Sequence, residues 1–332
     1  MGIAVKNSKW KFDWRKYGVS IALVALIIFF ALMSDKFLTQ NNIINILRQV
    51  SVVGICAVGM AFVIVSGSVD VGIGSALGLA AVAGARFMLA GLPTWLAVCL
   101  VIADGCLVGI VNGILICDIG MHPMIGTMGM QIFLRGIIYL ITQGMPIYGI
   151  HKNILFMGQG YVGIIPVPVI IMAAVFGVGF FILNKSVFGR LLYGVGGNAE
   201  ASRLSGVKVR LIKYQAFIIS GVLTAIAGLI LLARVNSGQP NAGERYEADI
   251  IPACVLGGVS LSGGEGNIGG VLVGVLIMGV LSNGMILMNV NEYWQWTIKG
   301  LVLLFAVAFD RLSQKSREKV TVTAKGAEDE KK

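Results

Sequence analysis

The side chains with the greatest chemical potential in this sequence are two acids in apolar surroundings. Asp70 follows a glycine-containing break after an apolar run, and Asp104 lies inside the apolar run 94–117. A lone charge at bilayer depth costs about 3 kcal/mol or more, so each acid must face a partner or water. We expect Asp70 to cap the freed N-terminus of an interrupted helix. A proton relay through Asp104 and a second acid is the alternative chemistry.

Three basic residues, Arg48, Arg135 and Lys299, also lie within apolar runs. Embedded bases of this kind face the interior of a helical bundle, where they find partners. They are therefore the available partners for Asp104 if all four side chains meet inside one bundle.

Several polar and aromatic residues stand near the ends of the expected helices. We predict that Asp70, Asn112, Gln131 and Asn283 line a translocation path through the bundle. The aromatic run Tyr293-Trp294-Gln295-Trp296 is typical of the belt that anchors helices at the membrane–water interface.

The motifs of a catalyst or a nucleotide site are missing from the sequence. It contains no G-x-x-x-x-G-K-[ST] phosphate loop, no H-E-x-x-H and no G-x-S-x-G, and Gly194-Val-Gly196-Gly197 lacks the required lysine. His122 and His151 have no ligand cluster beside them, and the five cysteines show no Cys-x-x-Cys spacing. We therefore expect no enzyme activity, and no metal or cofactor bound by this chain.

The composition indicates which elements position these residues. Hydrophobic residues make up 57% of the 332 residues, only 13% are charged, and glycine occurs 45 times. Soluble domains carry about a quarter charged residues, whereas glycine-rich apolar helices pack closely in lipid. The glycines of Gly105-x-x-x-Gly109-x-x-x-Gly113 should form one flat packing face. The expected fold class is an all-α, polytopic membrane bundle.

Apolar segments divide the chain into about ten expected membrane crossings. The segment 250–261 is short and reads as a half-helix or re-entrant segment. The first segment has the length of an uncleaved helix rather than a signal peptide. The segments are 17–33, 43–65, 72–91, 94–117, 123–142, 164–183, 214–233, 250–261, 268–288 and 294–310.

Basic residues set the expected orientation of these crossings. Most of the 26 Lys and Arg lie in residues 1–16, in the loop 184–213 and in the tail 311–332. Positive loops stay on the cytoplasmic side, so we place all three there, with a transmembrane domain at 17–310 and a disordered tail. This clustering explains the net charge of +10 without a nucleic-acid partner.

The loop 184–213 contains a short segment that is suited to docking. Asn198 is a helix-capping residue type, and Gly206 stands where a short helix would stop. A partner could grip such a helix on the cytoplasmic surface, although an ordinary solvated loop would show the same pattern. Internal repetition is only suggested. Ser66-Gly67 and Ser262-Gly263 fit a parallel repeat, whereas Gly109–Gly113 and Gly279–Gly284 fit an inverted one.

A series of motifs resembles the ribose/galactose-type permeases of bacterial ABC importers, in family order over about 50–310. The resemblance is densest in the cytoplasmic loop, with Phe188-Gly189-Arg190 and the run 196–207. Elsewhere it includes Gly59-Met60, Val63-Ile64, Ser66-Gly67, Asp70, Gly74-Ser75, Asn112-Gly113, Arg135-Gly136, Gln239–Gly243, Tyr246-Glu247, Asp249, Val255–Gly258, Asn283-Gly284, Tyr293 and Lys299-Gly300.

The resemblance implies a permease subunit of the bacterial inner membrane, in contact with membrane lipid. A second permease copy or a paralogue would pair with it, a separate ATPase would bind ATP and Mg below, and a periplasmic substrate-binding protein would dock above. It also implies that a coupling helix at 198–206 sits in a cleft of the ATPase. The coupling residues would be Asn198, Glu200, Ala201, Arg203, Leu204, Ser205 and Gly206.

The chain departs from the family pattern at Asp104 and Pro252, so its path and substrate can differ. The expected substrate is a monosaccharide, and a nucleoside or an autoinducer-type sugar is the alternative within the same class. A proton-coupled secondary transporter using Asp70 and Asp104 is the alternative from another class. It leaves the 198–206 segment unexplained.

Overall fold

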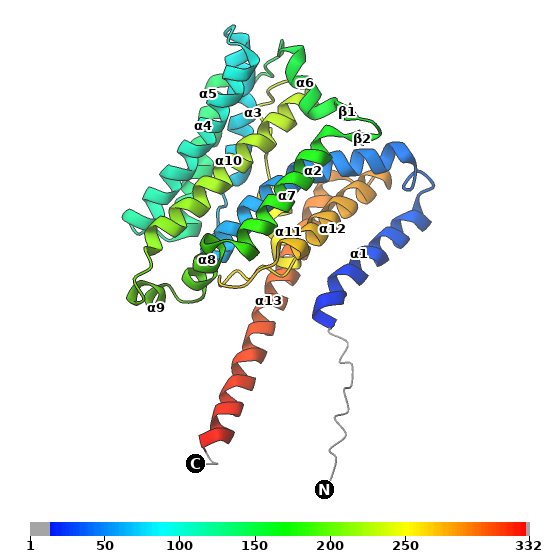
Figure 1. Ribbon diagram of the computed structural model, residues 1–332. Coiled ribbons are helices and arrows are strands. Elements are labelled where there is room, and N and C mark those ends of the chain that lie inside the picture. The colour runs from blue at the N-terminus through cyan, green and yellow to red at the C-terminus, as the bar shows by residue number, and fades with distance from the viewer. Residues whose placement is uncertain (1–13, 330–332) are drawn as a thin grey trace.

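The computed structural model describes the backbone of residues 14–329 and the side chains of residues 18–308 and 310–312. This part of the chain is helical apart from a small antiparallel hairpin (Figure 1). The elements are α1 (Trp14–Met33), α2 (Gln40–Val65), α3 (Ile73–Leu89), α4 (Thr94–Gly113) with the π-helical turn η1 (Ile114–Asp118), α5 (Pro123–Thr142), α6 (Lys152–Gln159), β1 (Tyr161–Val162), β2 (Ile165–Pro166), α7 (Val167–Lys185), α8 (Val187–Gly197), α9 (Ala199–Leu204), α10 (Val209–Val235), α11 (Glu247–Leu256), α12 (Ile268–Leu287) and α13 (Glu292–Asp329).

Burial separates central helices from peripheral ones. The apolar windows of α2 and α10 are 89% and 72% buried, so these helices are covered on nearly all sides. The windows of α4 and α7 are of similar hydropathy but only 39% and 33% buried, and that of α5, which is less apolar, is 28% buried. Apolar side chains that face outward suit a lipid environment, where the backbone hydrogen bonds stay inside each helix.

Six of the described helices are long and apolar enough to cross a membrane, and α3 and the described part of α1 are shorter apolar helices. The structure thus confirms an all-α polytopic membrane protein. The helix α11 has ten residues and is about 15 Å long, half of a bilayer core of about 30 Å. A short segment was predicted at 250–261. The helix in fact begins three residues earlier, at Glu247, and ends at Leu256.

The backbones of α4 and α10 approach closely along the predicted glycine face. A side chain at Gly105 would collide with the carbonyl of Gly221, and one at Gly109 would collide with that of Phe217. Small residues at these positions let the two helices touch. The glycine spacing in α4 therefore serves packing, as the sequence predicted.

An irregular segment, 236–246, precedes α11 and runs alongside α3. It pairs with Ile147 through Gly238 and then packs Gly243 against Gly74, near the start of α3. Arg135 of α5 donates to the carbonyls of Pro240 and Ala242, at 3.2 and 2.9 Å. Irregular backbone at membrane depth is tolerated where protein groups satisfy it in this way. The segment and α11 together form what we call the broken span, 236–256.

The helix α13 continues to Asp329 as one element. The sequence predicts a disordered tail from residue 311, so the backbone differs from that expectation. Lys and Glu are frequent in the tail and are good helix formers, which gives a physical reason for the difference. The basic N-terminal residues Lys6, Lys9 and Lys11 lie outside the described residues.

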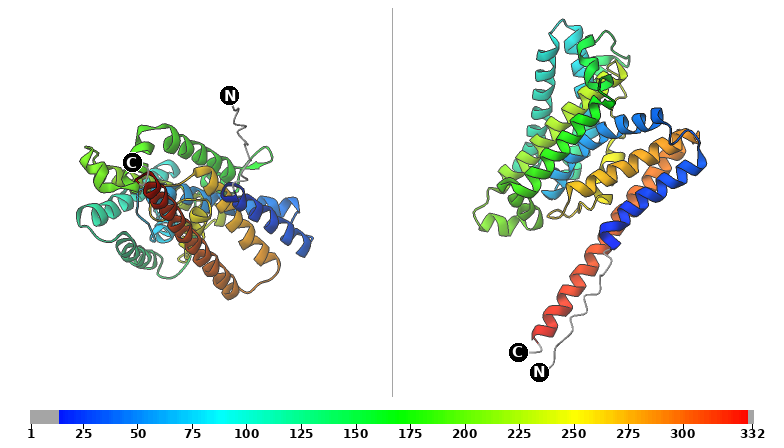
Figure 2. Two further views of the ribbon diagram at one scale, coloured as in Figure 1. Left: turned by 90° about the horizontal axis from the view of Figure 1, so that it is seen from below. Right: turned by 45° about the vertical axis from the view of Figure 1, so that its right-hand side comes forward.

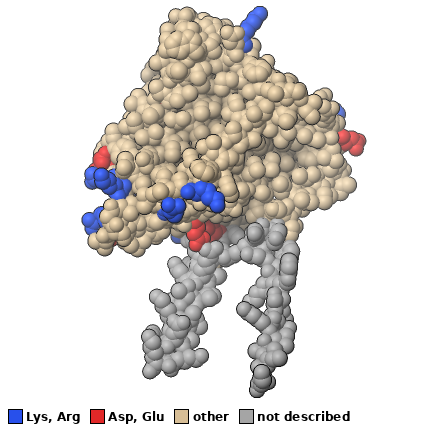
Figure 3. Space-filling view, viewed as in Figure 1, with Lys and Arg blue, Asp and Glu red and all other residues tan. Residues whose placement is uncertain are grey.

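The start of α1, the loop with α8 and α9, and the end of α13 lie at one end of the molecule (Figures 1 and 2). These are the three regions that the basic residues assign to the same side. On the face shown in Figure 3, charged residues are sparse over most of the surface, and Lys and Arg gather toward that same end.

Candidate functional site

The short helix α9 forms as the sequence predicted. The side chain of Asn198 accepts a hydrogen bond from the backbone N–H of Ala201 at 2.9 Å, which caps the first turn. Gly206 follows the helix with φ +83°, a left-handed conformation that glycine adopts without strain. Ser205 closes the last turn by donating to the carbonyl of Ala201 at 2.9 Å.

The surface of α9 is fully available to a partner. None of its residues is buried, and Leu204, a large apolar side chain, is 76% exposed. Glu200 and Arg203 form an ion pair one turn apart. The hydrogen bonds and the charge of Arg203 hold the pKa of the Glu200 carboxyl below its usual range, so this carboxyl is ionised at neutral pH. One exposed leucine is ordinary at a protein surface, so the docking role of α9 stays a prediction.

The base of this loop is anchored through four glycines, Gly67, Gly196, Gly263 and Gly264, which we call the glycine junction. The backbone N–H of Gly264 donates to the carbonyl of Val65, the last residue of α2, at 2.9 Å. A side chain at Gly196 would collide with both groups, and one at Gly263 would collide with Gly67 and Gly196. The junction therefore joins α8 directly to the end of α2 and to the α11–α12 turn.

The two Ser-Gly pairs that suggested a parallel repeat, at 66–67 and 262–263, thus meet at this junction. Near them, the Tyr193 hydroxyl on α8 donates to the carbonyl of Gly266 at 2.7 Å. A displacement of α9 and α8 would accordingly move both the end of α2 and the turn between α11 and α12.

A second polar site surrounds the start of α3. Asp70 is 5% exposed, and its Oδ1 accepts from the backbone N–H of Gly72 at 2.9 Å. Asn112 of α4 donates to Asp70 Oδ2 at 3.3 Å, and Thr127 of α5 accepts from the backbone N–H of Val71 at 3.0 Å. Asp70 therefore accepts from the residue just before α3, but no side chain caps the first turn of α3 itself, which differs from the helix cap that the sequence predicted.

Gln131 extends this site toward the broken span. Its backbone lies beside Gly72, and its side chain donates to Glu247 Oε1 at 2.9 Å. We call Asp70, Asn112, Thr127, Gln131 and Glu247 the central polar cluster. Two of its buried acceptor atoms, Asn112 Oδ1 and Glu247 Oε2, have no hydrogen-bond partner among the described residues. Buried acceptors without a partner in the protein are usual sites for an ordered water.

Asn283 lies apart from the central polar cluster. It exchanges two hydrogen bonds, both at 2.9 Å, with Asn42, and so joins α12 to α2. The structure therefore brings together three of the four residues predicted for the path, and it gives Asn283 a packing contact instead. A single sequence does not reveal that Asn42 is its partner, because the two are 241 residues apart.

The expected pairing of Asp104 with an embedded base is contradicted. Arg48 donates to the carbonyl of Gln159 and lies over the Tyr161 ring, Arg135 binds the broken span, and Lys299 pairs with Asp249 at 2.8 Å. Each base finds a partner that its own helix packing brings close.

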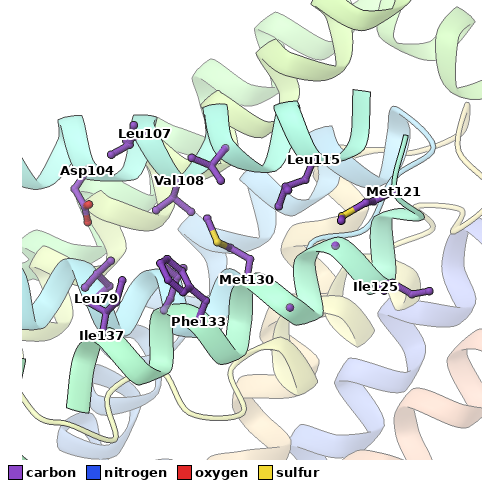
Figure 4. A pocket seen from close by; sticks show the side chains of 14 residues that line it. Leu79, Asp104, Leu107, Val108, Leu115, Met121, Ile125, Met130, Phe133 and Ile137 are labelled. Atoms are coloured by element: carbon purple, nitrogen blue, oxygen red, sulfur yellow. The ribbon is translucent and has the colours of Figure 1, made fainter. Parts of the chain in front are cut away.

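Asp104 instead borders a groove of about 600 Å³ between α4 and α5, beside Leu79, Phe133 and Ile137 (Figure 4). The residues lining this groove include no second acid and no base. No hydrogen bond or ion pair links Asp104 to another described residue. A proton relay through Asp104 therefore lacks a neighbouring acid that could exchange a proton with it.

Sequence reasoning missed Glu247 and Thr127 as members of the central polar cluster. Glu247 was noted only as part of a motif, because it falls outside the apolar run assigned at 250–261. Its position immediately before a short, proline-containing apolar segment is the signal that could have identified it, since broken helices place polar residues at membrane depth.

These features define a class, a polytopic helical membrane protein with a buried polar cluster and a short exposed helix in its α8–α10 loop. The chain belongs to the family described as "Branched-chain amino acid transport system / permease component", whose model matches residues 42–307. It is 42% identical over 299 residues to the ribose import permease protein of Bacillus subtilis (strain 168), covering 90% of this chain and 93% of that one.

Two further relatives come from Escherichia coli (strain K12). The ribose import permease protein is 40% identical over 298 residues, covering 89% of this chain and 93% of the relative. The L-arabinose transport system permease protein is 37% identical over 323 residues, covering 96% and 98%. No solved structure matches this chain.

Proposed function

We propose that this chain is the membrane permease of an ATP-driven importer and that it carries a monosaccharide of the ribose type across the bacterial inner membrane. A separate ATPase, which binds ATP and Mg, would supply the energy, because no phosphate loop occurs in the sequence. A periplasmic substrate-binding protein would deliver the sugar to the opposite end. We place both termini and α9 on the cytoplasmic side.

The observation that carries this proposal is the exposed helix α9, which follows α8 and its contacts at the glycine junction. A ligand shifts a conformational equilibrium only by its differential affinity for the two states. An ATPase dimer that binds α9 more tightly when the dimer is closed can apply such a bias, because α8 joins α9 to α2 and to the α11–α12 turn. The central polar cluster supplies hydroxyl-matching groups on the route between the two ends.

A second copy of the chain would complete the transport unit. The described helices α4, α5 and α7 keep large apolar surfaces exposed, and lipid or a second permease would cover them. The proposed count of about ten crossings treats the broken span as one crossing, shared between an irregular half and a helical half.

The energy source is tested by reconstitution. With the ATPase and the binding protein in proteoliposomes, we expect ribose uptake that needs ATP on the side of α9. The chain alone should show neither ATP hydrolysis nor uptake driven by a pH gradient. Uptake driven by a pH gradient without partners would establish a secondary transporter and contradict the proposal.

The docking role of α9 is tested at Ala201. Overpacking a close contact costs about 1–3 kcal/mol, so Ala201→Trp should strongly reduce co-purification of the ATPase while leaving expression intact. Ala90→Trp, which changes an exposed alanine beyond the end of α3, is the matched control and should retain the ATPase. Normal ATPase binding by Ala201→Trp would place the docking site elsewhere.

A nucleoside or an autoinducer-type sugar is the alternative cargo. The same uptake assay, repeated with each candidate solute and its binding protein, separates these cargoes from ribose.

A further inference from the structure

A polar cavity of about 600 Å³ lies on the other side of the broken span from the central polar cluster. It is enclosed by α2, by the second half of the 236–246 segment with the start of α11, by the end of α12 and by the start of α13. Its volume falls in the range of about 300–1,000 Å³ that is usual for small-molecule sites. Its position beside a discontinuous span is where transporters of other folds hold their substrates.

The lining of this cavity combines amide and aromatic side chains. Gln49, Asn241 and Gln295 bring both donors and acceptors, while Tyr246 and Trp296 bring flat apolar surface with a polar edge. Sites for small neutral molecules have this composition, with apolar surface and a few polar groups that fix orientation. An acyl chain would leave these polar groups unpaired, and so the lining disfavours a purely apolar ligand.

The charges of the cavity disfavour an anionic ligand. Lys299 is paired with Asp249, at 2.8 and 2.9 Å to its two oxygens, and the Arg245 guanidinium lies 3.4 Å from the centre of the Trp296 ring. The charge of Lys299 is thus neutralised by Asp249. Glu244 and Glu292 line the same cavity and would repel a phosphate or a carboxylate.

The stack of Arg245 on Trp296 suits a ligand that is apolar on its ring faces and polar around its edge. The guanidinium covers one face of the indole, so a sugar ring would stack its C–H groups on the other face, with the N–H groups of Arg245 available to its hydroxyls. Trp296 was expected to belong to an interfacial belt. The structure makes it a wall of the cavity, half-buried, while Trp294 of the same run is 64% exposed.

We infer that this cavity is a binding site for a neutral, polyhydroxylated sugar ring within the permease itself, with Trp296 as the stacking surface and Asn241 among the hydrogen-bonding groups. The inference rests on the proposed function and deepens it. The permease would then contribute to substrate selection, in addition to the soluble protein that delivers the sugar.

The test is direct binding to the full-length chain in lipid nanodiscs, without partners. Saturation-transfer NMR with D-ribose should give signals on the ring protons of the sugar. Trp296→Leu should reduce them at least tenfold, whereas Trp294→Leu, the matched change two residues away, should leave them unchanged. Ribose 5-phosphate and glucosamine serve as the anionic and cationic comparators, and both should bind more weakly than ribose.

Asn241→Ala keeps the test decisive if Trp296→Leu fails to fold. Asn241 is an exposed residue of the 236–246 segment, and its substitution should weaken ribose signals several-fold while the melting temperature stays constant. Absence of ribose signals from the wild type would overturn the inference, as would equal signals from all variants or tighter binding of either charged comparator.

Transport assays on the same preparations keep the two hypotheses separate. ATP-driven ribose uptake with partners, but without ribose contact at the cavity, would overturn the inference and leave the proposed function standing. The opposite result is ribose binding that is lost in Trp296→Leu, without ATP-driven uptake by the wild type and its partners. That result would support the sugar site in the cavity and overturn the proposed function.

Discussion

Asp70 shows how one buried carboxylate organises its surroundings. One of its oxygens accepts a hydrogen bond from the backbone N–H of Gly72, and the other accepts one from the side-chain amide of Asn112, which is 1% exposed. Because Asn112 belongs to α4, the carboxylate joins the break before α3 to a neighbouring helix. A group with two buried partners is costly to remove, since both are left without a hydrogen bond.

Asp70→Ala should therefore destabilise the protein by about 2 kcal/mol or more, because the backbone N–H of Gly72 and the amide of Asn112 would both lose their acceptor. Thermal unfolding in detergent, followed by tryptophan fluorescence, measures the change. Asp35→Ala, at an exposed position between α1 and α2, is the control and should melt like the wild type. Equal melting of both variants would show that Asp70 does not hold these elements together.

Asp104 presents the opposite case at the same scale. Its carboxylate borders an apolar groove and has no hydrogen-bond or ion-pair partner among the described residues. Burying a polar group without a partner costs free energy, so an apolar replacement relieves that cost. Asp104→Leu should keep ATP-driven uptake and melt at the same temperature as the wild type or above it. Loss of uptake at normal expression would restore the proton relay as a hypothesis.

At the scale of elements, the glycine junction explains how a short surface helix can act on buried helices. The closest approaches in this region join backbone to backbone, so a movement of α8 meets Val65 and Gly264 without intervening side chains. Packed interfaces of this kind transmit displacements because they cannot be compressed.

Gly196→Ala tests this connection, and Gly197→Ala is its neighbouring control. A methyl group at Gly196 would collide with the carbonyl of Val65, whereas one at Gly197 meets nothing within 4 Å. We expect Gly196→Ala to lower the melting temperature, since overpacking costs about 1–3 kcal/mol, and to reduce ATP hydrolysis stimulated by the loaded binding protein. Gly197→Ala should change neither. Identical behaviour of the two variants would argue against the junction as a coupling element.

At the scale of the whole molecule, the start of α1, the loop with α8 and α9, and the end of α13 lie at one end (Figure 1). This arrangement is the one that positive cytoplasmic loops require. It also separates the short helix α9 from the end where α1 joins α2 and where α6 lies (Figure 1).

Cysteine labelling in intact cells measures this orientation. In a background without the five natural cysteines, Lys36→Cys and Lys152→Cys should react with an impermeant maleimide. Ser205→Cys, which is equally exposed, should react only after the membrane is permeabilised. Labelling of Ser205→Cys from outside would invert the proposed topology and remove α9 from the reach of a cytoplasmic ATPase.

The sequence by itself determined the features that depend on composition or on neighbours along the chain. The all-α membrane class follows from apolar content, the glycine face of α4 from a four-residue period, and the cap of α9 from Asn198 next to its own helix. The hydrogen bond of Asp70 is also local, because Gly72 is two residues away.

Only the tertiary structure decided which distant groups meet. It paired Lys299 with Asp249 rather than with Asp104, paired Asn283 with Asn42, and placed the Arg245 guanidinium over the ring of Trp296. It also extended a short apolar segment into a broken span whose irregular half is held by Arg135. Embedded charges bind whichever partner helix packing brings within reach, and that packing depends on contacts between residues far apart in the chain.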